Sequence, residues 1–215
     1  MMEIMRLHPI TWPRLTDELA NRIERIEPAD GSAWPRVALD GAPAAQPERL
    51  AAELAEELRL RGRAVQRVRS TGFLRPASLR LEYGHQDADA YYSLWLDADA
   101  LFREVFTPLD PGGTGRILPD LRDPATDRAT RSPYVQLAPG TVLLLDGPLL
   151  QGRWFPFDLT VHLRMSPAAL RRRTPPADHW TLPAFARYEA EVTPAESADI
   201  LIQTDDPNRP AANLT

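Results

Sequence analysis

Two aspartates stand where carboxylate chemistry would be expected. Asp40 and Asp146 each end a short apolar run and precede a glycine, in "RVALDG" and "TVLLLDG". A carboxylate at the C-terminal end of a buried parallel strand faces the ligand crevice of an open α/β sheet. Two such carboxylates facing one crevice could hold Mg²⁺ through oxygen ligands, or they could cap neighbouring turns. The sequence leaves both interpretations open, and Asp146 is the stronger magnesium candidate.

The stretch after the first aspartate has the frame of a phosphate-binding loop without its chemistry. That loop reads G-x-x-x-x-G-K-[ST]: glycines let N–H groups surround the phosphates, lysine reaches the outer phosphates, and the hydroxyl holds magnesium. Here Gly41 is followed by Ala45 and then by Gln46, Pro47 and Glu48. Gln46 loses the tolerance for positive φ, Pro47 removes the lysine and an N–H, and Glu48 adds a negative charge. These changes suit an ordinary helix start, so we expect the usual phosphate-binding contacts to be absent.

The composition limits what could replace the missing lysine. All 25 basic residues are arginine, so a cation in any site must be an arginine, a histidine or a metal. Arg49, next to the loop, is the nearest substitute, although the planar fork of arginine needs a different geometry. A solvated helix residue is the alternative for Arg49.

Other classes of site and partner are disfavoured by composition. The chain has no cysteine, which excludes disulfides, thiolate metal sites and cysteine nucleophiles. Its four histidines lack H-x-x-H spacing, and we interpret His162, inside a strand, as a satisfied core residue. The net charge of −5 argues against a nucleic-acid partner. No apolar stretch has the length of a signal peptide or membrane span, so we expect a cytoplasmic protein without a membrane partner.

The hydrophobic pattern predicts the elements that position these residues. Strands are expected over residues 36–40, 63–70, 140–150 and 157–165 and in "ADILIQTDDP", as the last strand. Helices are expected over residues 11–26, 47–61 with Gly62 as C-terminal cap, 90–107, 166–173 and in "TLPAFARYEAEV", and a short hairpin around residues 117–121. This alternation predicts an α/β fold with a doubly wound, mainly parallel sheet flanked by helices. We expect a single domain over residues 36–215, with residues 1–35 as a helical extension packed on it.

The order of five segments resembles the uridine kinase group of P-loop kinases, most closely its bacterial uridine-kinase-like proteins. The segments are "VALDGAPAA", "STGFLRPASLR", "DADAYYSLWLDADALFREVFTPLDPGG", "VLLLDGPLL" and "ADILIQTDDPNRP". The resemblance implies a P-loop NTPase fold, ATP as phosphate donor, Mg²⁺ and a nucleoside acceptor. The aspartate that acts as general base in the family would fall at Ser70 or Thr71, and neither residue is basic.

The resemblance also implies which residues would surround the ligands. The acceptor pocket would comprise Thr71, Phe73, Arg75, Tyr83, His85, Asp87, Tyr91 and Tyr92. The aromatic residues among them could stack on a base, with packing as the alternative for the adjacent tyrosines and a surface loop for the aspartate. Arg171, Arg172 and Arg173 resemble the start of a lid helix whose arginines contact phosphates, or else form a solvated basic patch. "TPPADHW" follows them and is expected to end that helix early.

Three functions remain in competition. The first is a uridine-kinase-like protein that binds a nucleoside, nucleotide or small phosphorylated ligand without efficient ATP-dependent transfer. The second is an active nucleoside or small-molecule kinase that uses ATP and Mg²⁺ with Arg49, a lid arginine and Asp146 or Asp40. The third is a non-enzymatic protein that pairs with a true kinase, or with itself through its aromatic face.

Overall fold

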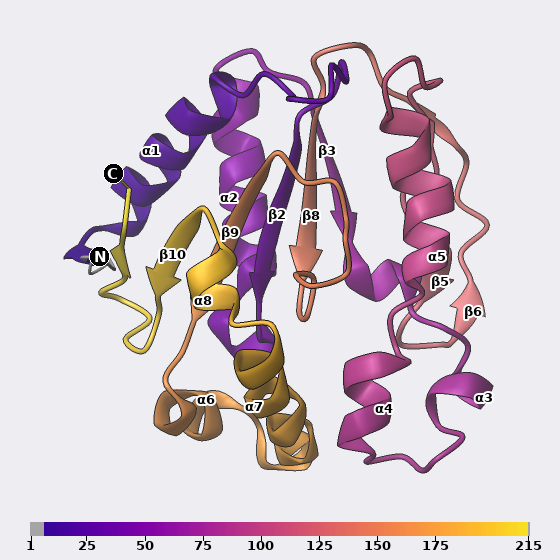
Figure 1. Ribbon diagram of the computed structural model, residues 1–215, viewed down its shortest axis with the longest axis vertical. Helices are drawn as coiled ribbons and strands as arrows, with labels where there is room; N and C mark the ends of the chain where they lie inside the picture. The colour runs from indigo at the N-terminus through magenta and orange to yellow at the C-terminus, as the bar shows by residue number, and fades with distance from the viewer. Residues whose placement is uncertain (1–6, 215) are drawn as a thin grey trace.

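A seven-stranded sheet forms the centre of the protein (Figure 1). The structure is a computed structural model and describes residues 7–214. The strand order is β1-β11-β10-β9-β2-β8-β3, and the five strands from β10 to β3 run parallel. Strand β11 pairs antiparallel with β10 on one side and with the edge strand β1 on the other. The expected doubly wound, mainly parallel sheet flanked by helices is therefore confirmed.

The strands and helices have the following bounds. The strands of the large sheet are β1 (His8–Pro9), β2 (Arg36–Gly41), β3 (Val65–Arg69), β8 (Val142–Gly147), β9 (Leu159–Arg164), β10 (Ile200–Gln203) and β11 (Ala211–Ala212). Two small ribbons pair β4 (Arg116–Ile117) with β7 (Val135–Gln136) and β5 (Arg122–Asp123) with β6 (Arg128–Ala129). The α-helices are α1 (Trp12–Glu24), α2 (Pro47–Leu60), α3 (Ala77–Arg80), α4 (Ala88–Ser93), α5 (Ala98–Leu101), α6 (Pro167–Arg173), α7 (Leu182–Glu191) and α8 (Pro194–Ser197).

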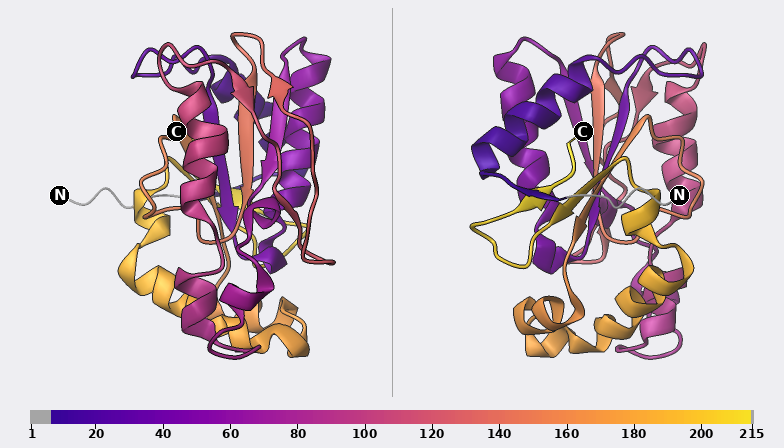
Figure 2. Two further views of the ribbon diagram at one scale, coloured as in Figure 1. Left: turned by 90° about the vertical axis from the view of Figure 1, so that its right-hand side faces the viewer. Right: turned by 60° about the vertical axis from the view of Figure 1, so that its left-hand side comes forward.

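Each face of the sheet is covered by its own apolar core. Leu39 and Leu144 pack with the buried faces of α1 and α2. Ala38 and Leu145, which are adjacent to them on the same strands, pack with α5 and the turns that follow it. Figure 2 shows α2 and α5 on opposite sides of the sheet. Because successive strand residues alternate between faces, the all-apolar strands are buried on both sides, as expected.

Most of the elements are found where the sequence predicts them. The five parallel strands and helices α1, α2, α6 and α7 fall within the expected ranges, with ends that differ by a few residues. Gly62 ends α2 with a φ of 80°, the conformation that favours glycine. Ser166 accepts a hydrogen bond from the N–H of Ala169 at 3.3 Å and so caps α6. The helix ends at Arg173, which confirms the expected early stop.

Three predicted elements are wrong in detail. Residues 90–107 do not form one helix, because Asp97 starts a new helix by accepting a hydrogen bond from the N–H of Ala100 at 3.0 Å. The hairpin lies at β5–β6, whereas Ile117 belongs to β4, which pairs with β7. The strand in "ADILIQTDDP", β10, is followed by β11 and is not the last.

The N-terminal residues join the core in two places. Helix α1 packs against α2, and β1 pairs with β11 near the C-terminus. Residues 1–6 lie outside the described part, and the division into an extension over residues 1–35 and a domain over residues 36–215 stays a prediction. Among residues 7–214, no helix has the length and apolar character needed to span a membrane.

Candidate functional site

The start of α2 has a left-handed turn at Gln46, where the sequence analysis places the second glycine of a phosphate loop. A short 3₁₀ turn, Pro43–Ala45, leads into Gln46, whose φ is 62° and ψ is 48°. The expectation that Gln46 would exclude positive φ is wrong. A non-glycine residue in this region costs about 1–2 kcal/mol, and the Gln46 side chain makes no capping hydrogen bond that would offset this cost. Pro47 takes the first helical position, as expected.

Glu48 and Arg49 both have partners outside the loop. A carboxylate oxygen of Glu48 lies 2.7 Å from Nη2 of Arg69, and both side chains are more than half exposed. Arg49 pairs with Glu53 along the helix, at 2.8 Å, and its guanidinium lies over the ring of Trp12. Arg49 is thus engaged by Glu53 and Trp12, although it also lines the cavity at the start of α2.

A cavity of about 430 Å³ lies at the N-terminus of α2, and we call it the α2 cavity. Its lining includes Gln46, Glu48, Arg67, Arg69 and Asp146. Nη2 of Arg67 lies 3.3 Å from a carboxylate oxygen of Asp146 and 3.1 Å from the carbonyl oxygen of Glu48. The Nε of Arg67 is buried without a hydrogen-bond partner. The α2 cavity therefore carries cationic groups with unused donor capacity.

Asp146 lies almost fully buried in the wall of this cavity. Burial raises the pKa of its carboxyl group, although the nearby Arg67 opposes the shift. Gly147 follows it with a φ of 151°, and a Cβ at this position would lie only 1.7 Å from Oγ of Ser70. Glycine is therefore required where β8 passes Ser70.

Asp40 does not share a crevice with Asp146, and this part of the sequence prediction is wrong. In the parallel register Leu39 lies beside Asp146, whereas Asp40 lies beside Gly147. The two carboxylates therefore point to opposite faces of the sheet. Among residues 7–214, no group of three or more histidine, cysteine, aspartate or glutamate side chains is arranged to hold a metal ion.

Asp40 is instead the centre of a buried hydrogen-bond network. Its carboxylate accepts from the N–H of Leu150 at 3.0 Å, from Nε2 of Gln151 at 3.2 Å and from the hydroxyl of Tyr188 at 2.9 Å. Nδ1 of His162 lies 2.7 Å from the same carboxylate. The alternative interpretation, in which the aspartate holds a neighbouring turn, is confirmed for the turn after β8.

A small aromatic cavity of about 200 Å³ adjoins the α2 cavity. Thr71 and Pro148 line both cavities, and Tyr91 and Trp95 line only the small one. The Tyr91 ring meets Trp95 edge to face with centroids 5.0 Å apart. Burial, with a smaller contribution from Asp178, raises the pKa of Tyr91, so its hydroxyl stays protonated. Thr71 and Tyr91 are the two predicted acceptor residues that the structure brings to these cavities.

The other predicted acceptor residues lie elsewhere. Phe73 is fully buried in the core, and Asp87 caps α4 through the N–H of Ala90 at 2.6 Å. Tyr83 and His85 are exposed and line none of these cavities. Arg75 and Tyr92 also lie outside them: the carbonyl oxygen of Arg75 accepts from Nε of Arg80 at 2.7 Å, and the Tyr92 hydroxyl donates to Glu191 at 3.0 Å. For these residues, local capping and packing decide the position.

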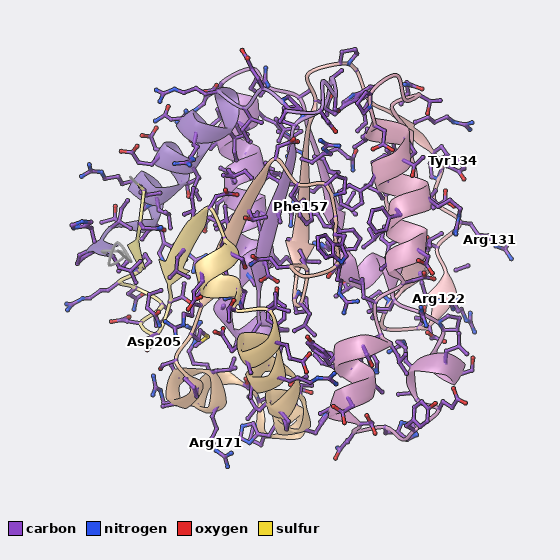
Figure 3. All side chains as sticks on the ribbon, in the orientation of Figure 1. Arg122, Arg131, Tyr134, Phe157, Arg171 and Asp205 are labelled. Carbon is purple, nitrogen blue, oxygen red and sulfur yellow. The ribbon has the colours of Figure 1, made fainter. Side chains whose placement is uncertain are left out.

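The three arginines that the resemblance assigns to a lid helix, Arg171, Arg172 and Arg173, have different surroundings. Arg173 donates to the carbonyl oxygen of Thr204 at 2.8 Å, which ties α6 to the end of β10. Arg171 extends from α6 at the edge of the molecule (Figure 3). It lines a third cavity, whereas Arg172 lines none of the three. The adjacent arginines therefore do not converge on one ligand.

The third cavity, of about 590 Å³, is one that the sequence analysis missed. It lies between the end of β9 and helices α6 and α7, and we call it the α6–α7 cavity. Its wall includes His162, whose interpretation as a satisfied core residue is only half correct. Nδ1 pairs with Asp40, but Nε2 is buried without a hydrogen-bond partner. No local sequence signal marks this residue, because its partner lies 122 residues away.

Comparisons with solved structures show the fold. A possible uridine kinase from Bacillus stearothermophilus is similar over 88% of this chain and 97% of its own, with 21% identity and a TM-score of 0.71. A protein from Silicibacter sp. TM1040, assigned as a fructose transport system kinase, is 20% identical over 88% and 95% of the two chains, with a TM-score of 0.55. The YGR205w protein is 11% identical over 95% and 99%, with a TM-score of 0.59.

The expected resemblance to P-loop kinases is confirmed at the level of the fold. No family model matches the chain. No curated protein matches it either.

Proposed function

We propose that this protein binds a nucleotide, a nucleoside or a small phosphorylated ligand on a uridine-kinase-like fold, without efficient ATP-dependent phosphoryl transfer. The observation that carries the proposal is the junction of the α2 cavity with the aromatic cavity through Thr71 and Pro148. An anion-binding part beside an aromatic part matches the two ends of a nucleotide. The similarity to the Bacillus stearothermophilus protein, a possible uridine kinase, supports the same ligand class.

The anion-binding part rests on two arginines. Among residues 7–214, Nε of Arg67 has no hydrogen-bond partner and the Arg69 side chain pairs only with the exposed carboxylate of Glu48. Arginine binds phosphate through several N–H donors in a fixed plane. A phosphate group in the α2 cavity would replace Glu48 as the partner of Arg69 and would lie near the N-terminus of α2, which favours anions.

The aromatic part would hold the base or another flat group. Tyr91 and Trp95 present ring edges and faces to a cavity large enough for a small ring. Stacking of a base on an aromatic side chain contributes about 1–3 kcal/mol. The protonated hydroxyl of Tyr91 adds one hydrogen-bond donor.

Four features argue against rapid phosphoryl transfer. The chain has no lysine to reach the outer phosphates, and Pro47 offers no N–H at the start of α2. Glu48 adds a carboxylate at the cavity. No carboxylate stands at Ser70 or Thr71, the positions where the resemblance would put a general base, and that assistance typically contributes 10²- to 10⁴-fold.

A second candidate function is an unorthodox kinase activity. It is favoured by Asp146, a nearly buried carboxylate in the wall of the α2 cavity, which could orient Mg²⁺. This function requires measurable ATP turnover that is lost in Asp146→Asn. Turnover that persists in this variant, or that is absent from the wild type, contradicts it.

The test is a thermal-shift screen with ATP–Mg²⁺, ADP, uridine, cytidine, UMP and inorganic phosphate. A ligand at a hundred times its Kd stabilises the fold by about 2.7 kcal/mol, which raises the melting temperature by a few degrees. We expect a shift with a nucleoside, a nucleotide or phosphate that disappears in Arg67→Gln. Arg14→Gln, on the exposed side of α1, is the control and should keep the shift. Efficient ATP turnover, or no shift with any compound, would overturn the proposal.

A further inference from the structure

The α6–α7 cavity is separate from the α2 cavity. The two have no lining residue in common, and the third cavity has a volume of about 590 Å³, within the range of small-molecule sites. It lies beyond the carboxyl ends of the strands, where open α/β sheets bind ligands. Its existence does not depend on the function proposed for the α2 cavity.

Most of the wall of the α6–α7 cavity is apolar. Leu163 and Met165 come from the end of β9, Leu170 from α6, and Leu182 and Phe185 from α7. Burial of apolar ligand surface against such side chains is favourable. The wall therefore favours a ligand with an apolar body.

His162 places one polar group in this wall. Its side chain is only 4% exposed, and among residues 7–214 its Nε2 has no hydrogen-bond partner. A buried polar group without a partner destabilises the fold. A ligand atom that accepts a hydrogen bond from Nε2 would remove this cost.

Asp40, which pairs with Nδ1, fixes the orientation of the His162 ring and favours its charged form. A carboxylate can only accept hydrogen bonds, so Nδ1 of His162 donates to Asp40. Burial alone would lower the pKa of His162, but its hydrogen bond to Asp40 and the nearby carboxylate of Glu189 raise it to about 9. Asp40 is itself held by Tyr188, Gln151 and the Leu150 N–H. At neutral pH Nε2 therefore carries a proton that points away from Asp40.

The charged groups at the rim favour an anion. Among residues 7–214, Glu189 is the only carboxylate that lines the cavity. Its Oε1 lies 3.6 Å from Nε2 of His162, and the Glu189 side chain is 40% exposed. Arg164 and Arg171 also line the cavity and make no side-chain hydrogen bond or ion pair with any residue from 7 to 214. His179 donates from Nε2 to backbone carbonyls of Arg171 and Thr174, so it is already engaged. Besides His162, two arginines thus line the cavity with one partly exposed carboxylate.

We propose that the α6–α7 cavity binds a small molecule with an apolar body and an anionic oxygen head group, which accepts from His162 Nε2 the hydrogen bond that Glu189, at 3.6 Å, does not accept. The apolar body lies against Leu170 and Phe185, and the head group lies between His162 and the rim arginines.

The experiment measures binding of three six-carbon probes by isothermal titration calorimetry. Hexanoate and hexyl phosphate carry the head group as carboxylate or phosphate, and 1-hexanol is the neutral control. We expect at least one anionic probe to bind with a single site, and to bind at least about tenfold more tightly than 1-hexanol, as expected for a charge-assisted hydrogen bond. The better of the two anions identifies the head group. Equal binding of all three probes, or no binding of either anion, overturns the proposal.

Two variants test the role of His162. Glu189→Gln removes the competing carboxylate and should tighten anion binding severalfold, whereas Glu191→Gln, on the same helix but outside the cavity, should not. His162→Gln should weaken it about tenfold.

Ala186→Trp, at an exposed position that lines the cavity, should abolish binding without a loss of folding. An unchanged affinity in both Glu189→Gln and His162→Gln overturns the proposal. Arg67→Gln should keep probe binding, which separates this site from the α2 cavity.

Discussion

Asp40 and His162 face each other from adjacent parallel strands, with Oδ2 of the carboxylate 2.7 Å from Nδ1 of the ring. The pair links the end of β2 to β9. Tyr188 of α7 and the turn after β8 join the same carboxylate. One buried anion thus holds together two strands, a turn and a helix, all at the carboxyl edge of the sheet where the cavities lie.

We expect Asp40→Asn to destabilise the protein by about 3 kcal/mol, because it leaves a buried His162 cation without its counter-charge. The free energy of unfolding from urea denaturation measures this effect. Glu18→Gln, which alters an exposed carboxylate on α1, is the control and should change stability by less than about 0.5 kcal/mol. A cost for Asp40→Asn as small as that of the control would show that the network contributes little.

The stability of the protein should fall between about pH 6.5 and 9 because of His162. Its pKa rises from 6.5 to about 9 on folding, so its contribution is fully present below pH 6.5 and is lost as pH rises through 9. Each unit of pKa shift corresponds to about 1.4 kcal/mol, so the loss can reach roughly 3 kcal/mol. Urea denaturation at several pH values from 6 to 9.5 measures it. His162→Gln should flatten this part of the profile, and the same slope in this variant would assign it to another group.

Gly147→Ala should cost about 2–4 kcal/mol, through an unfavourable backbone conformation and a clash with Ser70. Thermal or urea denaturation measures the loss. Adding Ser70→Gly to this variant should recover only part of the stability, because the positive φ remains. Full recovery in the double variant would mean that the clash alone makes glycine necessary.

The sequence predicts most of the sheet but little of the site. Apolar runs such as Val142–Gly147 mark buried strands by composition alone, and Gly62 marks a helix end. The pairing of Asp40 with His162 depends on β2 and β9 being neighbours, which no local pattern specifies. The break at Asp97 had a sequence signal, because aspartate is a favoured residue at a helix N-cap. The apolar periodicity on both sides of it nevertheless favoured one continuous helix.

The start of α2 offers a direct test of the proposal that this chain does not use a phosphate loop to bind ATP. Gln46→Gly alone should stabilise the protein by up to about 1 kcal/mol, because residue 46 has a φ of 62° that glycine adopts without strain. Combined with Pro47→Lys and Glu48→Ser, it restores the chemical groups that a phosphate loop needs.

We expect this triple variant to bind ATP–Mg²⁺ in the thermal-shift screen, whereas the wild type and Gln46→Gly do not. The left-handed turn is already in place, so only side chains and one N–H have to change. Asp146→Asn in the triple-variant background should weaken the shift if Asp146 orients the metal. If the triple variant folds but does not bind ATP–Mg²⁺, residues 46–48 alone do not prevent ATP binding, and the side chains of the α2 cavity, beginning with Arg67 and Arg69, are then the ones to exchange.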